Sequence, residues 1–472
     1  MNRKDFLKQT SLAAASVMLS KYAVAGAETP FPIVRVAEAK RKFRSAAVER
    51  VIAEVKNKIG NKEIAWMFEN CFPNTLDTTV DFEMMDGRPD TYVITGDIDA
   101  MWLRDSSAQV WPYLPLCKED KELQQLIKGV INRQVKCILL DPYANAFYKD
   151  PTKVSEWKND LTEMKPGIHE RKWEIDSLCY PIRLSYGYWK ETGDWTVFSD
   201  QWIKAVQLIL QTFKEQQRLE TKGPYHFQRT TAWATDGVPL GGYGYPVKPN
   251  GLICSMFRPS DDATVFPYLV PSNLFAAQSL LQLDDIFRYV KHDIKTGNEI
   301  MKLYDKIAAR IKDTCIIKHP NFGELLAYEV NGFGSHHFMD DANVPSLLSL
   351  PYLNCLKPEK EIYVNTKKFV LSENNPFFFK GKAAEGIGGP HCGMDMIWPM
   401  GIIMRGLTST DDKEIKLCLD MLQKTHAGTG FMHESFHKDD PTNYTRKWFA
   451  WANTLFGEFV WKTFREKPHL LN

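Results

Sequence analysis

The sequence predicts an all-α fold, a barrel of six inner and six outer helices called an (α/α)6 barrel. Two kinds of helical segment alternate six times along the chain. Segments of the first kind begin with a polar, aromatic-containing cluster and continue as an apolar run rich in small residues, which is typical of buried helices. Segments of the second kind are amphipathic and carry one apolar stripe. A ring of inner helices surrounded by outer helices buries both kinds of surface.

The six segments of the first kind are predicted to contain the inner helices. They begin at Thr95, Arg171, Phe257, Phe338, Glu385 and Phe431. The first of them reads TGDIDAMWLRDSSAQVWPYL. Every inner helix of such a barrel starts at the same end, so the six polar clusters are expected to meet at one mouth. A single Ser, Asp or Asn there is explained as a helix cap, but an additional Arg, Trp or His is not.

Six amphipathic segments are predicted to contain the outer helices. They span residues 36–59, 119–140, 197–218, 288–314, 358–372 and 411–424. The second of them includes LQQLIKGVINRQVKCILL, in which apolar residues recur at helical spacing between polar ones. Such a helix is suited to the outside of the barrel, with its apolar stripe against the inner ring.

Composition indicates a folded protein with a neutral partner. Of the 472 residues, 44% are hydrophobic, which is enough for a large core. The 59 Lys and Arg residues balance 58 Asp and Glu residues, so no global field would attract nucleic acid or an anionic membrane. The 13 Trp and 18 Tyr residues favour a ligand with an apolar face and many hydroxyl groups, as sugars have. The nine cysteines are dispersed without a C-x-x-C pair, so neither a disulfide framework nor a zinc site is predicted.

Residues 1–27 are predicted to be a signal peptide, and residues 28–472 a single catalytic domain. Arg3 and Lys4 precede a short apolar stretch, and small residues ending at Ala25 or Ala27 provide cleavage sites. We therefore expect export to the periplasm, or secretion from a host with a single membrane. The general secretory and twin-arginine routes both stay open, because Lys4 replaces an arginine. No later segment is apolar over the length of a membrane span, so the mature chain is not expected to associate with a membrane after the signal peptide is cleaved. The mature protein is expected to be a monomer.

Carboxylates are the most promising catalytic groups. The sequence has none of the motifs of serine hydrolases, P-loop proteins or zinc proteases, and no metal site or cofactor is predicted. Two carboxylates that face each other across a sugar can hydrolyse a glycosidic bond. The candidates are Asp261 or Asp262 in the third cluster and Glu434 in the sixth. Inner helices three and six lie on opposite sides of a six-membered ring, and a wide gap between the carboxylates favours inversion.

Other residues of the clusters are candidates for sugar binding. Arg104 and Asp105 can each form hydrogen bonds with two neighbouring hydroxyl groups, and Trp102 can stack on a sugar ring. From the local sequence alone, a buried Arg–Asp ion pair and a core Trp are equally good interpretations. The full set of predicted sugar ligands is Asp97, Asp99, Trp102, Arg104, Asp105, Arg258, Asp262, Asp341, His391 and His433.

The six clusters together resemble those of glycoside hydrolase family 125, the exo-α-1,6-mannosidases. The resemblance is carried by TGDIDAMWLRDSSAQVWPYL, EIDSLCYP, FRPSDDA, FMDDANVPSLL, EGIGGPH and FMHESF, and it covers most of the mature chain. It implies an (α/α)6 barrel and metal-independent hydrolysis with inversion. It also implies release of single mannose units from the non-reducing ends of α-1,6-linked mannose oligosaccharides.

The resemblance also implies roles for the carboxylates. The family's acid falls on the aspartate pair of FRPSDDA and its base on Glu434. Related inverting toroidal glycosidases carry an adjacent acidic pair whose first member protonates the leaving oxygen. By that analogy Asp261 is the acid, kept protonated by partial burial and by the charge of Asp262, and Asp262 helps to bind the departing sugar. Asp262 is the alternative acid.

Three other functions stay open from the sequence. A glucoamylase-like enzyme would be another inverting exo-glycosidase on the same barrel. A non-catalytic periplasmic glycan-binding protein would explain the aromatic residues but not the opposed carboxylates. A terpene cyclase would also be a helical barrel with an Asp-rich mouth, but this mouth lacks the basic residues that hold a diphosphate.

Overall fold

The computed structural model describes residues 31–472, of which Val34–Asn472 form one compact unit. The predicted signal peptide, residues 1–27, and the predicted start of the catalytic domain at residue 28 lie outside the described residues. Within the described part of the chain, no helix is long and apolar enough to cross a membrane.

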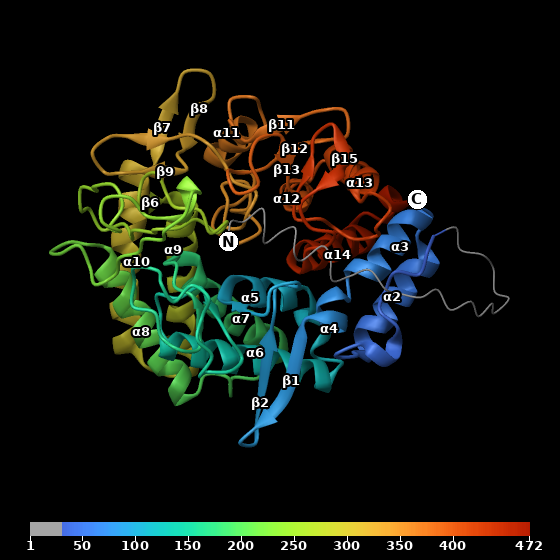
Figure 1. Cartoon of the computed structure of the whole chain (residues 1–472), viewed down its shortest axis with the longest axis horizontal. Helices are drawn as coiled ribbons and strands as arrows, with labels where there is room; N and C mark the ends of the chain where they lie inside the picture. Colours follow the sequence, from blue (N-terminus) through green and yellow to red (C-terminus); the bar gives the residue numbers. More distant parts are fainter. Residues whose placement is uncertain (1–30) are drawn as a thin grey trace. The chain divides into compact units, whose positions relative to one another are not determined.

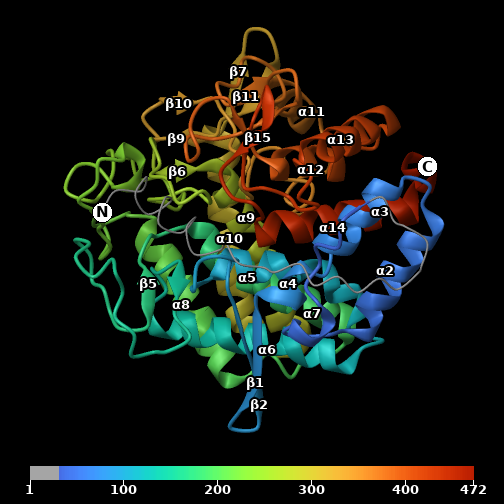
Figure 2. The ribbon, with the colours of Figure 1, turned by 45° about the vertical axis from the view of Figure 1, so that its right-hand side comes forward.

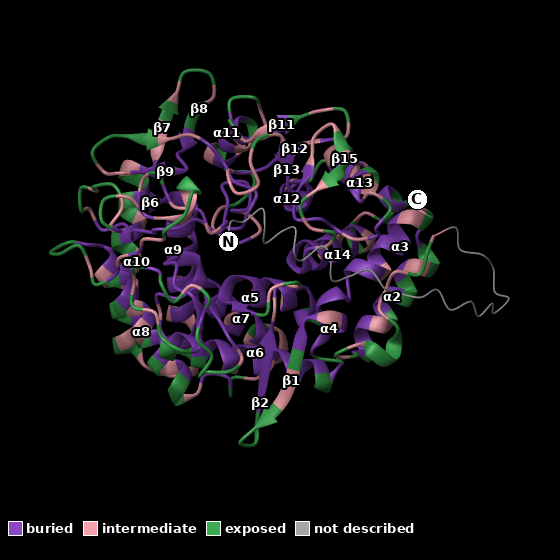
Figure 3. Cartoon of the chain, in the orientation of Figure 1, coloured by how far each residue is buried: buried purple, intermediate pink, exposed green. Residues whose placement is uncertain are grey.

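Five helices form the inner layer of this unit. They are α5 (Leu103–Val110), α7 (Ile175–Thr192), α9 (Val270–Asp285), α12 (Pro399–Leu407) and α14 (Ala450–Glu466). Helix α5 packs against α7, α7 against α9, and α12 against α14, while α14 returns to pack against α5 (Figure 1). Most residues of these five helices are buried (Figure 3), as their apolar and small residues predict. The inner helices were thus correctly predicted in five of the six segments.

The outer layer matches the amphipathic segments one for one. These segments contain α2 (Ala46–Lys58), α6 (Lys121–Leu140), α8 (Asp200–Gln216), α10 (Ile294–Thr314), α11 (Glu361–Val370) and α13 (Asp412–Thr425). Two further helices, α3 (Lys62–Cys71) and α4 (Asn74–Thr78), follow α2. Side chains that precede the outer helices, such as Ser45 and Asp120, accept hydrogen bonds from free backbone N–H groups and fix where α2 and α6 begin.

The fourth inner segment is an exception, because residues 338–360 contain no helix or strand. Pro345 and Pro351 interrupt this stretch and remove backbone N–H groups that a helix would use. The carboxylate of Asp340 instead accepts hydrogen bonds from the backbone N–H groups of Leu347 and Leu348, at 2.8 and 3.0 Å. The segment is nevertheless mostly buried. Our prediction of an inner helix was therefore wrong here, and packed turns take its place.

In residues 31–472, six small antiparallel sheets, which the all-α prediction did not include, accompany the helices. Four strands end just before an inner helix: β3 (Met101–Trp102), β5 (Ile168–Glu170), β6 (Tyr268–Leu269) and β13 (Met396–Ile397). The others are β1 (Val80–Met85), β2 (Arg88–Val93), β4 (Ala146–Phe147), β7 (Ile316–His319), β8 (Gly323–Leu326), β9 (Glu329–Val330), β10 (His336–His337), β11 (Phe378–Lys380), β12 (Glu385–Ile387), β14 (Phe436–His437) and β15 (Asp440–Tyr444). Their orders are β1-β2, β3-β4-β5, β10-β9-β6, β7-β8, β11-β12 and β13-β14-β15.

The sheets fix where the inner helices start. The sheet β3-β4-β5 links the beginning of α5 to the beginning of α7, and β13 is paired with β14 directly before α12. Because these strands lead into helix N-termini, the polar residues beside them are held close together. The β1-β2 hairpin has a different position: β2 packs along α6, and both views show the turn end of the hairpin projecting beyond the helices (Figures 1 and 2).

Candidate active site

One pocket lies at the N-terminal ends of the inner helices. Its volume is about 420 Å³, part of it open to solvent. Six of the predicted site residues line it: Trp102, Arg104, Asp105, Asp261, His391 and Glu434. They come from four of the six polar clusters, and they include a carboxylate from the third cluster and one from the sixth. The structure therefore brings the predicted acid and the predicted base to one cavity.

Arg104 is the centre of a buried cluster of four carboxyl groups. Its guanidinium lies 2.5 Å from Glu174, 3.0 Å from Asp261, 3.5 Å from Asp176 and 3.6 Å from Asp105. Burial raises the pKa of Asp105 to about 6 and the pKa of Asp176 to about 7. Burial, with the charges of neighbouring carboxylates, raises the pKa of Glu174 well above its ordinary value. One guanidinium cannot balance four buried charges, so part of this cluster is protonated at neutral pH.

The adjacent aspartates Asp261 and Asp262 point in different directions. The side chain of Asp261 is 23% exposed and lines the pocket, and its backbone has a φ of 65°, in the left-handed region. The side chain of Asp262 is 2% exposed and accepts a hydrogen bond from the Thr235 hydroxyl at 2.7 Å. His391 lies 3.4 Å from the other oxygen of Asp262. Of the two aspartates, only Asp261 is in a position to meet a ligand in this pocket.

The groups that set the pKa of Asp261 differ from those we expected. Burial and the charge of Glu170 raise this pKa, but the charges of Arg104 and Lys172 and a hydrogen bond from Glu174 outweigh them and leave the pKa below its ordinary value. Asp262, which was expected to keep Asp261 protonated, is turned toward His391 and Thr235. The carboxyl group that forms a hydrogen bond with Asp261 is Glu174.

Glu434 is held by residues that follow β15. Glu434 lies just before β14, and Thr445 and Arg446 lie just after β15, so the antiparallel pairing of the two strands brings these residues together. The Thr445 hydroxyl donates to Oε2 of Glu434 at 2.8 Å, and Nε of Arg446 lies 3.6 Å from Oε1. The Glu434 side chain is 10% exposed and borders the pocket. This arrangement fixes the orientation of a carboxylate at the wall of the pocket.

Aromatic side chains form much of the pocket wall. Trp102 lies in β3, and its ring packs edge-on against His169 with the ring centres 5.2 Å apart. Trp398, Phe449 and Trp451 line the pocket from the starts of α12 and α14. Such rings suit the apolar face of a sugar.

Besides Asp262, five predicted sugar ligands are engaged in contacts within the protein and do not line the pocket. Nε of Arg258 pairs with Glu329 at 2.7 Å, and both side chains are buried. Asp341 is fully buried and accepts hydrogen bonds from Asn343. Asp99 is exposed and pairs with Lys153 at 3.2 Å. His433 is buried, and its ring stacks on the ring of Tyr444. The half-exposed side chain of Asp97 lies outside the pocket lining and pairs with Arg446 at 3.6 Å.

The polar residues of the site that sequence reasoning missed include Glu174, Asn343 and Arg446. Asn343 and Arg446 line the pocket, and Glu174 lies behind Asp261. Glu174 directly precedes α7, and its closeness to a helix start is a signal similar to that of Asp105, which lies in the first turn of α5. Arg446 lies in a loop after a strand, where no helical periodicity would single it out. Among residues 31–472, no group of three His, Cys, Asp or Glu side chains is arranged to hold a metal ion.

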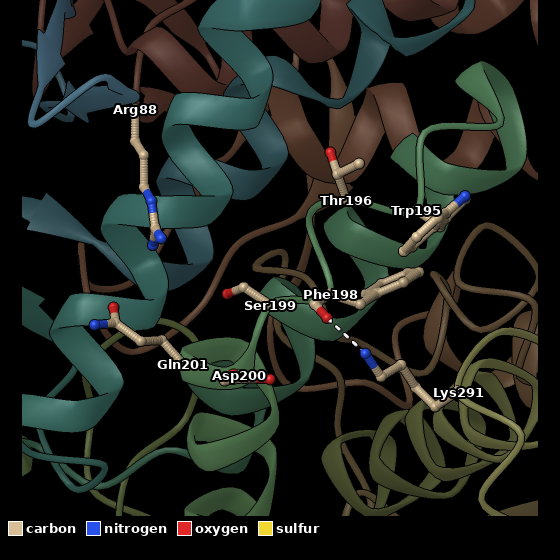
Figure 4. Close-up of a pocket in the computed structure, with 8 residues that line it drawn as sticks. All are labelled: Arg88, Trp195, Thr196, Phe198, Ser199, Asp200, Gln201 and Lys291. Carbon is tan, nitrogen blue, oxygen red and sulfur yellow. Dashed lines mark hydrogen bonds between the residues drawn. The ribbon is translucent and has the colours of Figure 1, made fainter.

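A second pocket, about 880 Å³ in volume, lies beside the start of α8 (Figure 4). Its wall includes Arg88, Trp195, Asp200 and Lys291, and the Lys291 ammonium donates to the backbone carbonyl of Phe198 at 3.1 Å. Asp200 is its one carboxylate. This larger pocket therefore lacks the pair of carboxylates that glycoside hydrolysis needs.

Comparison with known proteins agrees with the pocket. The family model described as metal-independent alpha-mannosidase (GH125) matches residues 61–461. The chain belongs to glycoside hydrolase family 125. This family 125 protein is therefore a glycoside hydrolase, and the match spans all six polar clusters.

Two relatives extend the comparison for this family 125 chain. The meiotically up-regulated gene 157 protein of Schizosaccharomyces pombe is 43% identical over an alignment of 461 positions, and the match covers 93% of this chain and 90% of the relative. A metal-independent alpha mannosidase of Streptococcus pneumoniae, solved in a non-productive complex with alpha-1,6-mannobiose, is 39% identical with a TM-score of 0.86. That comparison covers 90% of this chain and all of the other. A GH78 rhamnosidase of Bacillus sp. GL1 shares the fold alone: it is 10% identical with a TM-score of 0.52. That comparison covers 85% of this chain and 35% of the rhamnosidase chain.

Proposed function

We propose that this family 125 hydrolase is an exo-acting α-1,6-mannosidase that works with inversion. The observation that carries the proposal is the pair of carboxylates, Asp261 and Glu434, at one aromatic-lined pocket. The solved relative that was crystallised with alpha-1,6-mannobiose supports the choice of substrate. Family membership favours a hydrolase over the non-catalytic binding protein and the terpene cyclase.

In the proposed mechanism Asp261 is the general acid and Glu434 the general base. Asp261 donates a proton to the glycosidic oxygen as the bond to the anomeric carbon breaks. Glu434, oriented by Thr445 and Arg446, removes a proton from the water that attacks the anomeric carbon from the opposite face. For inversion the two carboxyl groups are expected to be about 6.5–9.5 Å apart.

Recognition of the terminal mannose is assigned to residues that border the pocket. Arg104 and Asp105 are placed to bind hydroxyl groups, and Trp102 offers a ring to the apolar face of the sugar. Asp262 acts indirectly in this scheme, since it lies beside His391, which lines the pocket. No metal or cofactor takes part in the proposed reaction.

The proposal extends to architecture and location. The closure of the inner layer through α14 and α5, with the fourth position filled by the turns of residues 338–360, supports an (α/α)6 barrel. The N-terminal sequence supports export of a monomeric enzyme to the periplasm, or its secretion from a host with a single membrane.

Proton NMR of the anomeric signals during digestion of α-1,6-mannobiose tests the function. We expect β-mannose to appear first, and the Glu434→Ala variant to release none. Early α-mannose would contradict inversion. If no mannose is released, a panel of aryl α-glycosides tests the glucoamylase-like alternative, and hydrolysis of another glycoside in that panel would replace the substrate proposed here.

A further inference from the structure

Glu174 is a buried carboxyl group beside the proposed acid that the mechanism above does not use. Its side chain is fully buried, directly before α7. Nη1 of Arg104 and the hydroxyl of Ser177 both donate to its Oε2, at 2.5 and 2.7 Å. Among the residues that the structure describes, no N–H or O–H donor reaches Oε1. A buried carboxylate oxygen without a donor is costly, so Oε1 is the place for a proton.

Asp261 has the complementary arrangement. Nη2 of Arg104 and Nδ2 of Asn145 both donate to its Oδ1, at 3.0 and 3.3 Å. A proton on Asp261 therefore belongs on Oδ2. The carboxyl group of Glu174 is within hydrogen-bonding reach of the Asp261 carboxyl group, which gives a proton on Glu174 an acceptor. Two carboxyl groups this close cannot both ionise without a large cost, so the pair holds one proton.

Other carboxyl groups share the surroundings of Glu174. Asp105 on α5 and Asp176 on α7 face the same guanidinium as Glu174, and burial raises their pKa values to about 6 and about 7. Burial, with the charges of Asp261 and Asp176, raises the pKa of Glu174 well above its ordinary value. This direction agrees with the lack of an N–H or O–H donor at Oε1 among the described residues, and both observations favour Glu174 as the group that carries the proton.

We propose that Glu174 stores the proton that Asp261 donates to the glycosidic oxygen. This inference rests on the proposed function, and in it Glu174 is a positioning residue that acts through Asp261. As the bond from the anomeric carbon breaks, the glycosidic oxygen keeps the electron pair and takes the shared proton. The pair is left with two negative charges, which Arg104, in contact with both carboxylates, partly balances. The proton that Glu434 takes from water passes to solvent, and a proton from solvent restores the pair.

The test compares two substrates in the Glu174→Gln variant. Glutamine keeps the shape of the side chain and donates to Asp261 from its amide, but it has no proton to give up. Hydrolysis of α-1,6-mannobiose needs a protonated leaving oxygen, whereas an aryl α-mannoside with a strongly acidic phenol does not. We expect kcat on mannobiose to fall about 100-fold or more, with little change in KM and a much smaller fall in kcat on the aryl mannoside.

A matched control is the Glu458→Gln variant. Glu458 lies in α14, burial also raises its pKa, and it accepts a hydrogen bond from the Tyr352 hydroxyl at 2.8 Å. It lies outside the pocket lining, so this variant should keep the wild-type ratio of the two activities. Equal losses on both substrates in Glu174→Gln would overturn the proposal, as would unchanged activity on both. If Glu174→Gln does not fold, Glu174→Asp is the second variant. Its side chain is shorter by one methylene, which moves the carboxyl group away from Asp261, and we expect the same selective loss of kcat on mannobiose.

A spectroscopic measurement separates this inference from the proposed function. If the wild-type protein releases no mannose, the proposed function fails, but the stored proton can still be observed. Infrared spectra of protein labelled with isotopic glutamate should show a carboxylic-acid C=O band at neutral pH that is reduced in Glu174→Gln. An identical band in the variant would show that Glu174 is ionised and would overturn the inference.

Discussion

Replacing Arg258 by methionine separates a structural role from a role in binding sugar. The sequence placed Arg258 among the sugar ligands, but in the structure its guanidinium lies 2.7 Å from Glu329, with side-chain exposures of 3% and 0%. Glu329 also accepts hydrogen bonds from the backbone N–H groups of Val265 and Phe266, both at 3.0 Å. The Arg258→Met variant therefore removes the guanidinium from a buried carboxylate, whose remaining neighbours are the two backbone N–H groups and His337, at 3.9 Å.

The expected loss of stability is about 3–5 kcal/mol at neutral pH, the usual cost of removing one partner from a buried ion pair. Burial raises the pKa of Glu329, but Arg258 and the hydrogen bonds outweigh burial and hold the pKa below its ordinary value. The wild-type pair thus contributes stability above the ordinary pKa of Glu, and this contribution is lost as pH falls through the folded-state value. In the variant the pKa of Glu329 rises, so its stability defect should shrink as the pH falls toward about 4 and Glu329 becomes protonated.

Urea denaturation across this pH range, together with kinetics, is the assay. The Arg258→Met/Glu329→Gln double variant is the control, because it removes both charges and keeps a carbonyl acceptor for the two backbone N–H groups. We expect it to recover much of the lost free energy of unfolding. If Arg258→Met instead unfolds like the wild-type protein and its KM rises strongly, Arg258 binds sugar and the structural interpretation is wrong.

Three smaller predictions follow from other parts of the structure. Asp99→Asn should leave KM for α-1,6-mannobiose nearly unchanged, since the Asp99 side chain is 74% exposed and does not line the pocket; a tenfold rise would contradict this. Thr445→Val, which removes the donor to Glu434, should lower kcat about tenfold, the equivalent of one hydrogen bond of about 1.4 kcal/mol, and an unchanged kcat would show that Glu434 does not need this donor. Gly388→Ala should cost about 1–3 kcal/mol in urea denaturation, because its Cβ would lie 2.1 Å from the Met396 carbonyl oxygen, whereas a loss near zero would mean that the backbone moves aside easily.

Helix positions follow from the sequence more readily than interruptions of helices do. Hydrophobic patterning alone locates all six outer helices and five inner ones, because burial of an apolar face decides where a helix forms. Proline in these segments is compatible either with the start of a helix or with a turn. Pro271 and Pro399 lie in the first turns of α9 and α12, where no backbone donor is needed, whereas Pro345 and Pro351 lie where the chain forms turns. Only packing, here the Asp340 carboxylate satisfying two N–H groups, distinguishes the two outcomes.

The candidate site was predictable to the level of clusters but not of individual side chains. Charged residues at the starts of inner helices indicate where a pocket forms, and Asp261 and Glu434 both line it. Which of two adjacent aspartates faces the pocket depends on the backbone conformation at Asp261, which the sequence does not specify. Arg446 reaches Glu434 through the pairing of two short strands, and contacts of that kind have no periodic signature.

The left-handed backbone at Asp261 restricts which residues this position accepts, independently of catalysis. That conformation costs most residues about 1–2 kcal/mol, while Gly, Asn and Asp adopt it readily. Asp261→Asn therefore removes the carboxyl group, and with it the charge that faces Arg104, without adding backbone strain, whereas Asp261→Ala adds that strain. The substitutions that the backbone tolerates best, to Asn and Gly, both remove the proposed proton donor. Under the proposed mechanism, a single substitution at this position would yield a folded chain that binds sugar without cleaving it, a short route from an enzyme to a lectin-like protein.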